Sequence, residues 1–237
     1  MNKIKDIIIT DILGIKHTAE IFVLGKENFN EVKNFILYEH SLMDNKNFFI
    51  IDDIDETLLK TLNKNDGIFL GVYVNRKLIA TEGVDFFCDT NIHFKNVSNN
   101  ILGAYKFAEI GWTMVSYDYR GNNLSNILTQ CLEEYILPMD ASFILCATIH
   151  PENIACLKSF FKALYKGCDF NYLYGYPRLL LIKYWLNPIV DINEFDKKWV
   201  KCTDHQKQKK FFVNKYYCDD IRFVNKEICL GFNKQIK

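Results

Sequence analysis

Apolar residues recur at helical spacing in several parts of the chain. The clearest run lies just after Gly121, where one apolar residue follows another at i, i+3, i+4, i+7, i+8 and i+11: Leu124, Ile127, Leu128, Cys131, Leu132 and Tyr135. This spacing is typical of one face of an amphipathic helix. Similar patterns predict helices over residues 26–42, 55–63, 151–164 and 204–213. In the 151–164 helix, Pro151 is expected at the first position, and the apolar face is Ile154, Leu157, Phe160, Phe161 and Leu164.

Strands are predicted where apolar residues alternate or run on without a break. The segments are 19–25, 67–74, 77–87, 107–117, 141–150, 178–186, 221–224 and 228–232. Asn75 and Arg76 separate two of them and predict a tight hairpin turn. Residues 88–105 are polar and without pattern, which predicts a long loop. The order β-α-α-β-β-β-α-β-α-β up to residue 186 predicts a mixed α/β fold.

Composition narrows the class of protein. With 237 residues, 49% of them hydrophobic, the chain can bury a substantial core, and it has room for one large domain with an appendage. The formal net charge is zero, so no bulk attraction to nucleic acid or to an anionic membrane is expected. Eight widely spaced cysteines form no CxxC motif. We therefore expect a cytoplasmic protein with free thiols, and neither a membrane span nor a cleaved leader is predicted.

The segment SYDYRGNNLSNIL, residues 116–128, lies between a predicted strand and a predicted helix. Such a turn gathers the first backbone N–H groups of the helix around one point, and the helix dipole favours an anion there. The segment does not match a Walker loop, because no lysine follows Gly121 at the required spacing, and it does not match GxGxxG. Asn123 can adopt a left-handed conformation and Ser125 is small, so one glycine is sufficient for the turn. Taken alone, the segment fits a polar turn that caps an amphipathic helix better than it fits a phosphate site.

The next strand and helix add a second element. EIGWTMVSYDYRGNNLSNIL followed by FILCATIHPENIACLKSFF resembles the two central units of the GNAT family of acyl-CoA-dependent N-acyltransferases. The hairpin GVYVNRKLIA and the stretch YLYGYPRLLLIKYW are similar to neighbouring strands of that family. The resemblance covers residues 19–187 and implies a twisted mixed sheet flanked by helices. It suggests a catalytic domain over 1–187 and a C-terminal extension, a short helix and two strands, over 188–237.

By the same resemblance, the cofactor is acetyl-CoA and the acceptor is an amine of a small molecule or a peptide. Thr113, Met114 and Val115 would offer backbone groups to the pantetheine arm. Asn153 would lie near that arm, and the turn would hold the pyrophosphate through Arg120, Gly121, Asn122, Asn123, Leu124 and Ser125. Asn123 and Ser125 stand in place of the glycines of the family's turn, which puts the strength of cofactor binding in question.

The reaction needs a group that removes a proton from the amine. Glu109, on the strand before the turn, is the first candidate, although a purely structural glutamate is an equal alternative. Glu82 on the hairpin is the second candidate and fits a structural role better. The family often places a tyrosine seven residues after the asparagine, to protonate the leaving thiolate, but Phe160 occupies that position here. Tyr117, Tyr119 and Tyr165 are no convincing replacements, so no acid is assigned.

Other chemistry is less well supported. Cys146 and Cys156 lie in apolar segments and fit the core better than a nucleophilic site with His150. His40, His93 and His150 have no metal-ligand spacing, so no metal is expected. The basic run over 207–210 fits a solvated helix face. Two further hypotheses stay open: a CoA-binding sensor or scaffold without turnover, and an interaction domain that has lost the cofactor.

Overall fold

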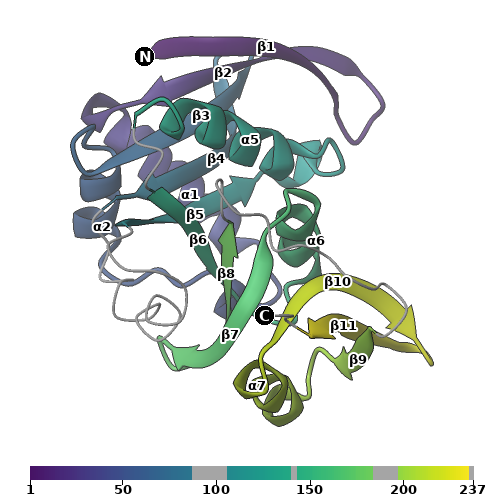
Figure 1. The fold of residues 1–237 in the computed structure, drawn as a ribbon. Helices are drawn as coiled ribbons and strands as arrows, with labels where there is room; N and C mark the ends of the chain where they lie inside the picture. Colours follow the sequence, from purple (N-terminus) through teal and green to yellow (C-terminus); the bar gives the residue numbers. More distant parts are fainter. Residues whose placement is uncertain (87–105, 140–142, 184–196, 235–237) are drawn as a thin grey trace. The chain divides into compact units, whose positions relative to one another are not determined.

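The computed structural model describes residues 1–86, 106–139, 143–183 and 197–234 (Figure 1). The chain falls into two compact units. Unit 1 consists of Met1–Cys88 and Ala108–Ala141, and unit 2 consists of Asp89–Phe107 and Ser142–Lys237. The predicted loop over 88–105 and the predicted boundary at 187 lie outside the described residues, so both stay predictions.

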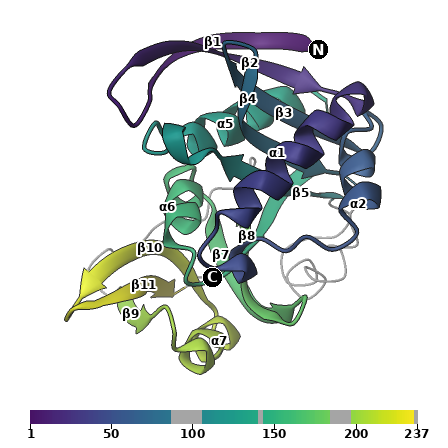
Figure 2. The same cartoon turned by 180° about the vertical axis from the view of Figure 1, so that it is seen from behind.

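Unit 1 is a sheet with helices on both faces. Its strands follow the order β1 (Asn2–Thr10), β2 (Lys16–Leu24), β3 (Gly67–Val74), β4 (Lys77–Asp85) and β5 (Lys106–Val115), and each neighbouring pair is antiparallel. Helix α5 (Leu124–Ile136) covers one face, while α1 (Phe29–Ser41) and α2 (Ile54–Thr61) cover the other (Figures 1 and 2). Short 3-10 turns lie at Lys26–Asn28, Lys46–Phe48 and Tyr117–Tyr119.

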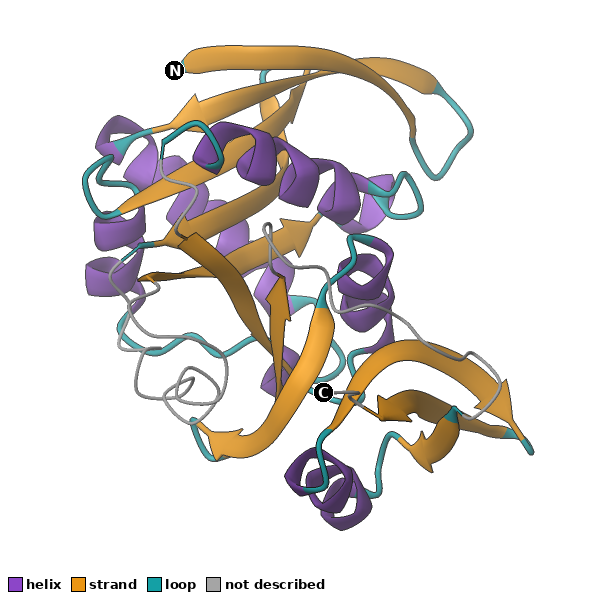
Figure 3. Ribbon diagram, in the orientation of Figure 1, coloured by secondary structure: helices purple, strands orange, loops and turns teal. Residues whose placement is uncertain are grey.

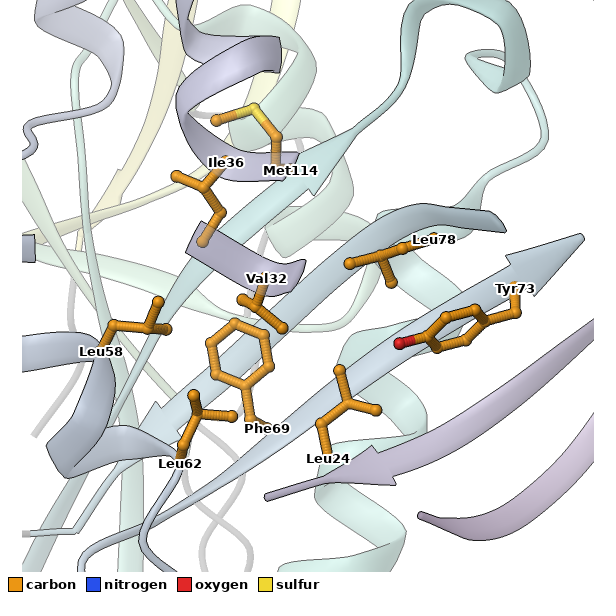
Figure 4. Close-up of a cluster of buried hydrophobic side chains, with 9 residues drawn as sticks. All are labelled: Leu24, Val32, Ile36, Leu58, Leu62, Phe69, Tyr73, Leu78 and Met114. Atoms are coloured by element: carbon orange, nitrogen blue, oxygen red, sulfur yellow. The ribbon is translucent and has the colours of Figure 1, made fainter. Parts of the chain in front are cut away.

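The apolar face of α1 packs on the sheet as its periodicity predicts. Val32 and Ile36 are fully buried, and they meet Phe69 of β3 and Met114 of β5 in one cluster (Figure 4). Leu58 and Leu62 bring α2 and its C-cap into the same cluster. Burying an aliphatic or aromatic side chain of this kind contributes about 1.5–3 kcal/mol. This packing therefore fixes α1 and α2 against strands β3 to β5.

The hairpin of β3 and β4 is confirmed with its turn. Asn75 and Arg76 have φ values of 49° and 66°, so both central residues are left-handed. A two-residue turn of this kind matches the right-handed twist of the flanking strands. The hairpin places Glu82 and Asp85 on β4, next to β5.

The described part of unit 2 contains six strands and two helices (Figure 3). The strand order is β6 (Phe143–Ile149), β8 (Tyr176–Lys183), β7 (Lys166–Leu173), β10 (Tyr216–Val224), β11 (Glu227–Lys234) and β9 (Lys198–Lys201). Helix α6 (Ile154–Lys162) packs against β10, and α7 (His205–Val213) packs on β7 and β10. Asp204 caps α7 by accepting a hydrogen bond from the Lys207 backbone N–H.

A half-buried ion cluster joins three strands of unit 2. Asp219 on β10 lies 3.1 Å from the Lys166 ammonium of β7 and 2.9 Å from that of Lys197. It also accepts hydrogen bonds from the Asn233 side chain of β11. Among the described residues, β10 pairs with β7 at a single register position, Cys218 with Gly167. The ion cluster therefore reinforces a junction that has little backbone pairing.

Some elements differ from the sequence prediction. Strands β1, β7 and β9 were not predicted. Pro151 does not open a helix, because α6 begins at Ile154 with Asn153 as its N-cap, so Pro151 lies in the preceding turn. Leu164 does not belong to the buried face. It lies beyond the end of α6, with φ of 70° and an exposed fraction of 70%.

The predicted α/β class, with helices flanking a sheet, is confirmed. In the part of the chain that the structure describes, no helix combines the length and apolar character needed to cross a membrane.

Candidate functional site

A β-bulge interrupts the pairing of β4 with β5. The register shifts between Thr81 and Gly83, and Trp112 has a left-handed φ of 56°. The Thr81 hydroxyl donates to the Trp112 carbonyl oxygen over 2.9 Å, and the Trp112 indole N–H donates to Thr61 Oγ1 of α2 over 3.1 Å. An extra residue of this kind re-aims the side chains around it and often lies beside a functional site.

Near the bulge, the residues predicted to contact the pantetheine arm have side chains on opposite faces of the sheet. Met114 and Trp112 belong to the cluster under α1 and α2. The Thr113 side chain points to the opposite face, where its hydroxyl donates to Glu82. Val115 continues the pairing with Ala80. The predicted backbone contacts of Thr113, Met114 and Val115 with a pantetheine arm stay predictions.

The turn after β5 has the backbone conformation that its sequence allows. Gly121 has φ of 87°, and Asn123, the N-cap of α5, has φ of 60°. A Cβ built on Gly121 would meet no atom within 4 Å, so the demand for glycine there comes from φ alone. Asparagine tolerates the left-handed region better than most residues. One glycine and one asparagine therefore make the turn that glycine-rich loops make elsewhere.

Asn122 anchors this turn to the β1–β2 hairpin. Its Oδ1 accepts from the Thr10 backbone N–H over 2.8 Å, and its Nδ2 donates to the Thr10 carbonyl over 2.6 Å and to the Tyr119 carbonyl over 2.9 Å. The Ile12 backbone N–H adds a bond to the Asp118 carbonyl. The Asn122 side chain is thus committed within unit 1, so a contact between this residue and a phosphate would come from its backbone.

The N-terminus of α5 has the features of an anion site. The helix has 13 residues, and the positive end of its dipole lies at the turn. Among the described residues, the Asn123 side chain accepts no capping hydrogen bond from the helix, and it donates instead to Asn126 Oδ1. Leu124 is buried and Ser125 is half-buried. Arg120 is exposed; its Nε donates to the Val115 carbonyl, and its guanidinium lies 5.5 Å from the centre of the Tyr117 ring.

Glu109 lies on the face of the sheet that α1 and α2 cover. It stands directly opposite Asp85 in the β4–β5 register, and opposed residues share a face. Asp85 accepts a hydrogen bond from Thr61 of α2, which identifies that face. Burial raises the pKa of Asp85 to about 6, while Lys60 and Thr61 lower it and Glu109 and Asp66 raise it further. Glu109 is half-buried and shares its face with Trp112 and Met114.

Glu82 occupies the opposite face and is completely buried. Its Oε1 accepts hydrogen bonds from the hydroxyls of Thr113 on β5, over 2.9 Å, and Thr129 on α5, over 3.0 Å. Its Oε2 has no hydrogen-bond partner within the described residues. Burial raises the pKa of Glu82 to about 8, with a further contribution from the Glu133 charge, although the two hydroxyls oppose the rise. Glu82 therefore links β4, β5 and α5, which is the structural role that its sequence position favoured.

Unit 2 holds the remaining candidates. Asn153 Oδ1 accepts from the Cys156 backbone N–H over 3.3 Å and caps α6. Phe160 is buried on α6, and its ring meets that of the fully buried Tyr165 at 4.9 Å. The two residues pack together in the interior of unit 2, so Phe160 has a core role at the position where the family often has tyrosine.

His150 does not have the protonation behaviour of a base near neutral pH. Its pKa is lowered to about 4, mainly by burial and further by the charges of Arg178 and His205. Its Nδ1 accepts from the Glu152 backbone N–H over 3.2 Å. Cys146 is fully buried and Cys156 is half-buried. Within the described ranges, no group of three His, Cys, Asp or Glu side chains could hold a metal ion.

No protein-family model matches the sequence, and no curated protein is significantly similar to it. Solved structures are similar in fold. One is FeeM, an N-acyl amino acid synthase from uncultured soil microbes, with a TM-score of 0.54 and 12% identity over 71% of this chain and 92% of that one. Another is NAA60 of Arabidopsis thaliana in complex with acetyl-CoA, with a TM-score of 0.51 and 9% identity over 70% of this chain and 98% of that one. Identities this low show the fold alone, and the chain therefore has the GNAT fold that the resemblance of its two strand–helix units implied.

Proposed function

We propose that the protein is an acyl-CoA-dependent N-acyltransferase that moves an acetyl group from acetyl-CoA to an amine. The observation that carries this proposal is the bulged strand β5 followed by a left-handed turn at the N-terminus of α5. Backbone N–H groups and the helix dipole at such a turn suit a pyrophosphate. The shared fold with an N-acyl amino acid synthase and with a protein solved with acetyl-CoA supports the same assignment.

In the proposed reaction, the neutral amine nitrogen attacks the thioester carbonyl carbon. The C–N bond forms, the C–S bond breaks, and CoA leaves as the thiolate. Glu109 takes the proton that the amine nitrogen loses, directly or through a water. The thiolate recovers a proton to give CoA, and because a thiol has a pKa of about 8.5, this departure near neutral pH needs no dedicated acid. Phe160 in place of tyrosine is compatible with such a mechanism.

The turn would hold the pyrophosphate with the backbone N–H groups of Gly121 to Ser125 and with the exposed Arg120 side chain. Thr113, Met114 and Val115 would carry the pantetheine arm on β5, and the role that the resemblance implies for Asn153 stays a prediction. The Asn122 anchor to Thr10 keeps the turn in place before the ligand arrives. Such preorganisation lowers the free energy that binding must supply for ordering.

A transfer assay tests this function. The purified protein is incubated with acetyl-CoA and a panel of primary amines, and release of free CoA thiol and acetylated amine is followed. We expect turnover with at least one amine, and equal amounts of thiol and acetylated product. CoA binding without transfer to any amine would favour the sensor or scaffold hypothesis, and absence of CoA binding would leave only an interaction domain.

A further inference from the structure

A buried carboxylate on α1 has no role in the functional site described above. Glu39 is 2% exposed, and its Oε2 has no hydrogen-bond partner among the described residues. It lies seven residues after Val32 and three after Ile36, the two core residues of the same helix. Residues at this spacing share one helix face, so Glu39 continues the face that packs on the sheet.

The surroundings of Glu39 connect it to the bulge in β5. Ile36, one turn earlier, lies in the same cluster as Met114 (Figure 4). His40, the next residue, donates from its ring to the Phe49 carbonyl over 3.1 Å, if Nε2 carries the proton. The Phe49 ring meets the Trp112 ring at 6.0 Å. Glu39 therefore lies in the part of unit 1 where α1 covers β5, on the face that also carries Glu109.

A lone buried carboxylate is unfavourable unless a donor or a cation satisfies it. The two lysines nearest to Glu39 in the sequence are bound elsewhere. Lys33 forms an ion pair with Asp55, and Lys46 donates to the carbonyl oxygens of His40 and Ser41. Unit 1 thus contains a buried carboxylate oxygen without a partner from its own described residues, on the helix face that packs toward the strand that the proposed function assigns to the thioester.

We infer that Glu39 binds a positively charged group of the acceptor, an inference that rests on the proposed function. A carboxylate stabilises the protonated form of an amine that it contacts. The attacking nitrogen must lose its proton, so the group held by Glu39 is a second, non-reacting one. The acceptor class that fits is a diamine, or an amine with another cationic group, with Glu109 serving the reacting nitrogen and Glu39 the charged end.

Calorimetric titration in the presence of CoA tests this inference with two probes of similar length. These are 1,4-diaminobutane and butylamine, which differ in the second ammonium group. We expect the native protein to bind the diamine more tightly than butylamine. Glu39→Gln, which keeps the size of the side chain, should weaken diamine binding by about 10- to 100-fold, the range expected for a lost charged hydrogen bond, and leave butylamine binding unchanged.

Glu56→Gln, at an exposed position of α2, is the matched control and should bind both probes as the native protein does. Thermal unfolding of each variant shows that the fold is retained. Equal binding of the two probes by the native protein, or an equal loss for both in Glu39→Gln, would overturn the inference. The transfer assay is scored separately, so diamine binding without acetylation would reject the proposed function and keep the Glu39 site.

Discussion

Glu82→Gln is expected to stabilise the protein relative to the native sequence by an amount that grows as the pH rises from 5 to 9. The folded chain keeps the Glu82 carboxyl protonated up to a pKa of about 8, whereas the unfolded chain ionises it near 4.5. The contribution of Glu82 to stability is therefore complete below pH 4.5 and is lost as the pH rises toward 8. Glutamine cannot ionise, so it avoids this loss, which is roughly 3–5 kcal/mol over that interval.

Urea unfolding at pH 5, 7 and 9 measures the effect. The amide oxygen of the substituted glutamine can still accept from Thr113 and Thr129, so the packing between β4, β5 and α5 should survive. Glu134→Gln, at an exposed position of α5, is the control for replacing a glutamate by glutamine in this part of the fold. A flat difference for Glu82→Gln would mean that Glu82 ionises as readily in the folded chain as in the unfolded one.

Glu109→Gln is expected to lower kcat of the proposed transfer by about 100- to 10,000-fold, the range for loss of a positioned general base. CoA affinity should stay the same, because Glu109 precedes the bulge and does not belong to the residues or the turn that are proposed to bind CoA. Steady-state kinetics over pH 6 to 9, with CoA binding measured in parallel, separates the two effects.

The control for Glu109 is again Glu134→Gln, which is expected to have native kcat. If Glu109→Gln keeps the native rate across this pH range, Glu109 is no base, and the structural alternative for this glutamate is correct. A parallel loss of CoA affinity would instead indicate that the substitution disturbs β5 as a whole.

Elements governed by local pattern could be predicted from the sequence. The helix after Gly121 and the Asn75–Arg76 hairpin were predicted correctly because spacing and turn chemistry act over a few residues. Strand β7 was missed because a bulge between Gly167 and Asp169 interrupts its alternation. Strand β1 was missed because its polar residues break the apolar run, although Ile9 is buried.

The candidate site was predictable only in part. The left-handed conformations of Gly121 and Asn123 agree with the properties of those residue types. The anchor between Asn122 and Thr10 joins residues 112 positions apart, and no local pattern reports such a contact. The same is true of Glu39. Its helical position places it beside Val32 and Ile36, but only the folded chain shows that its Oε2 is buried without a partner among the described residues.

Calorimetric titration of CoA into the native protein and into Gly121→Val tests the central claim most directly. Valine is strongly disfavoured at the φ of 87° that Gly121 adopts, so the turn should distort. We predict that the native protein binds CoA and that Gly121→Val binds it at least about tenfold more weakly, which corresponds to about 1.4 kcal/mol. Gly175→Val, at a β7–β8 hairpin glycine with φ of 79° and equally open surroundings, should keep native affinity. No CoA binding by the native protein, or equal affinity in Gly121→Val, would contradict the assignment of this turn as the pyrophosphate site.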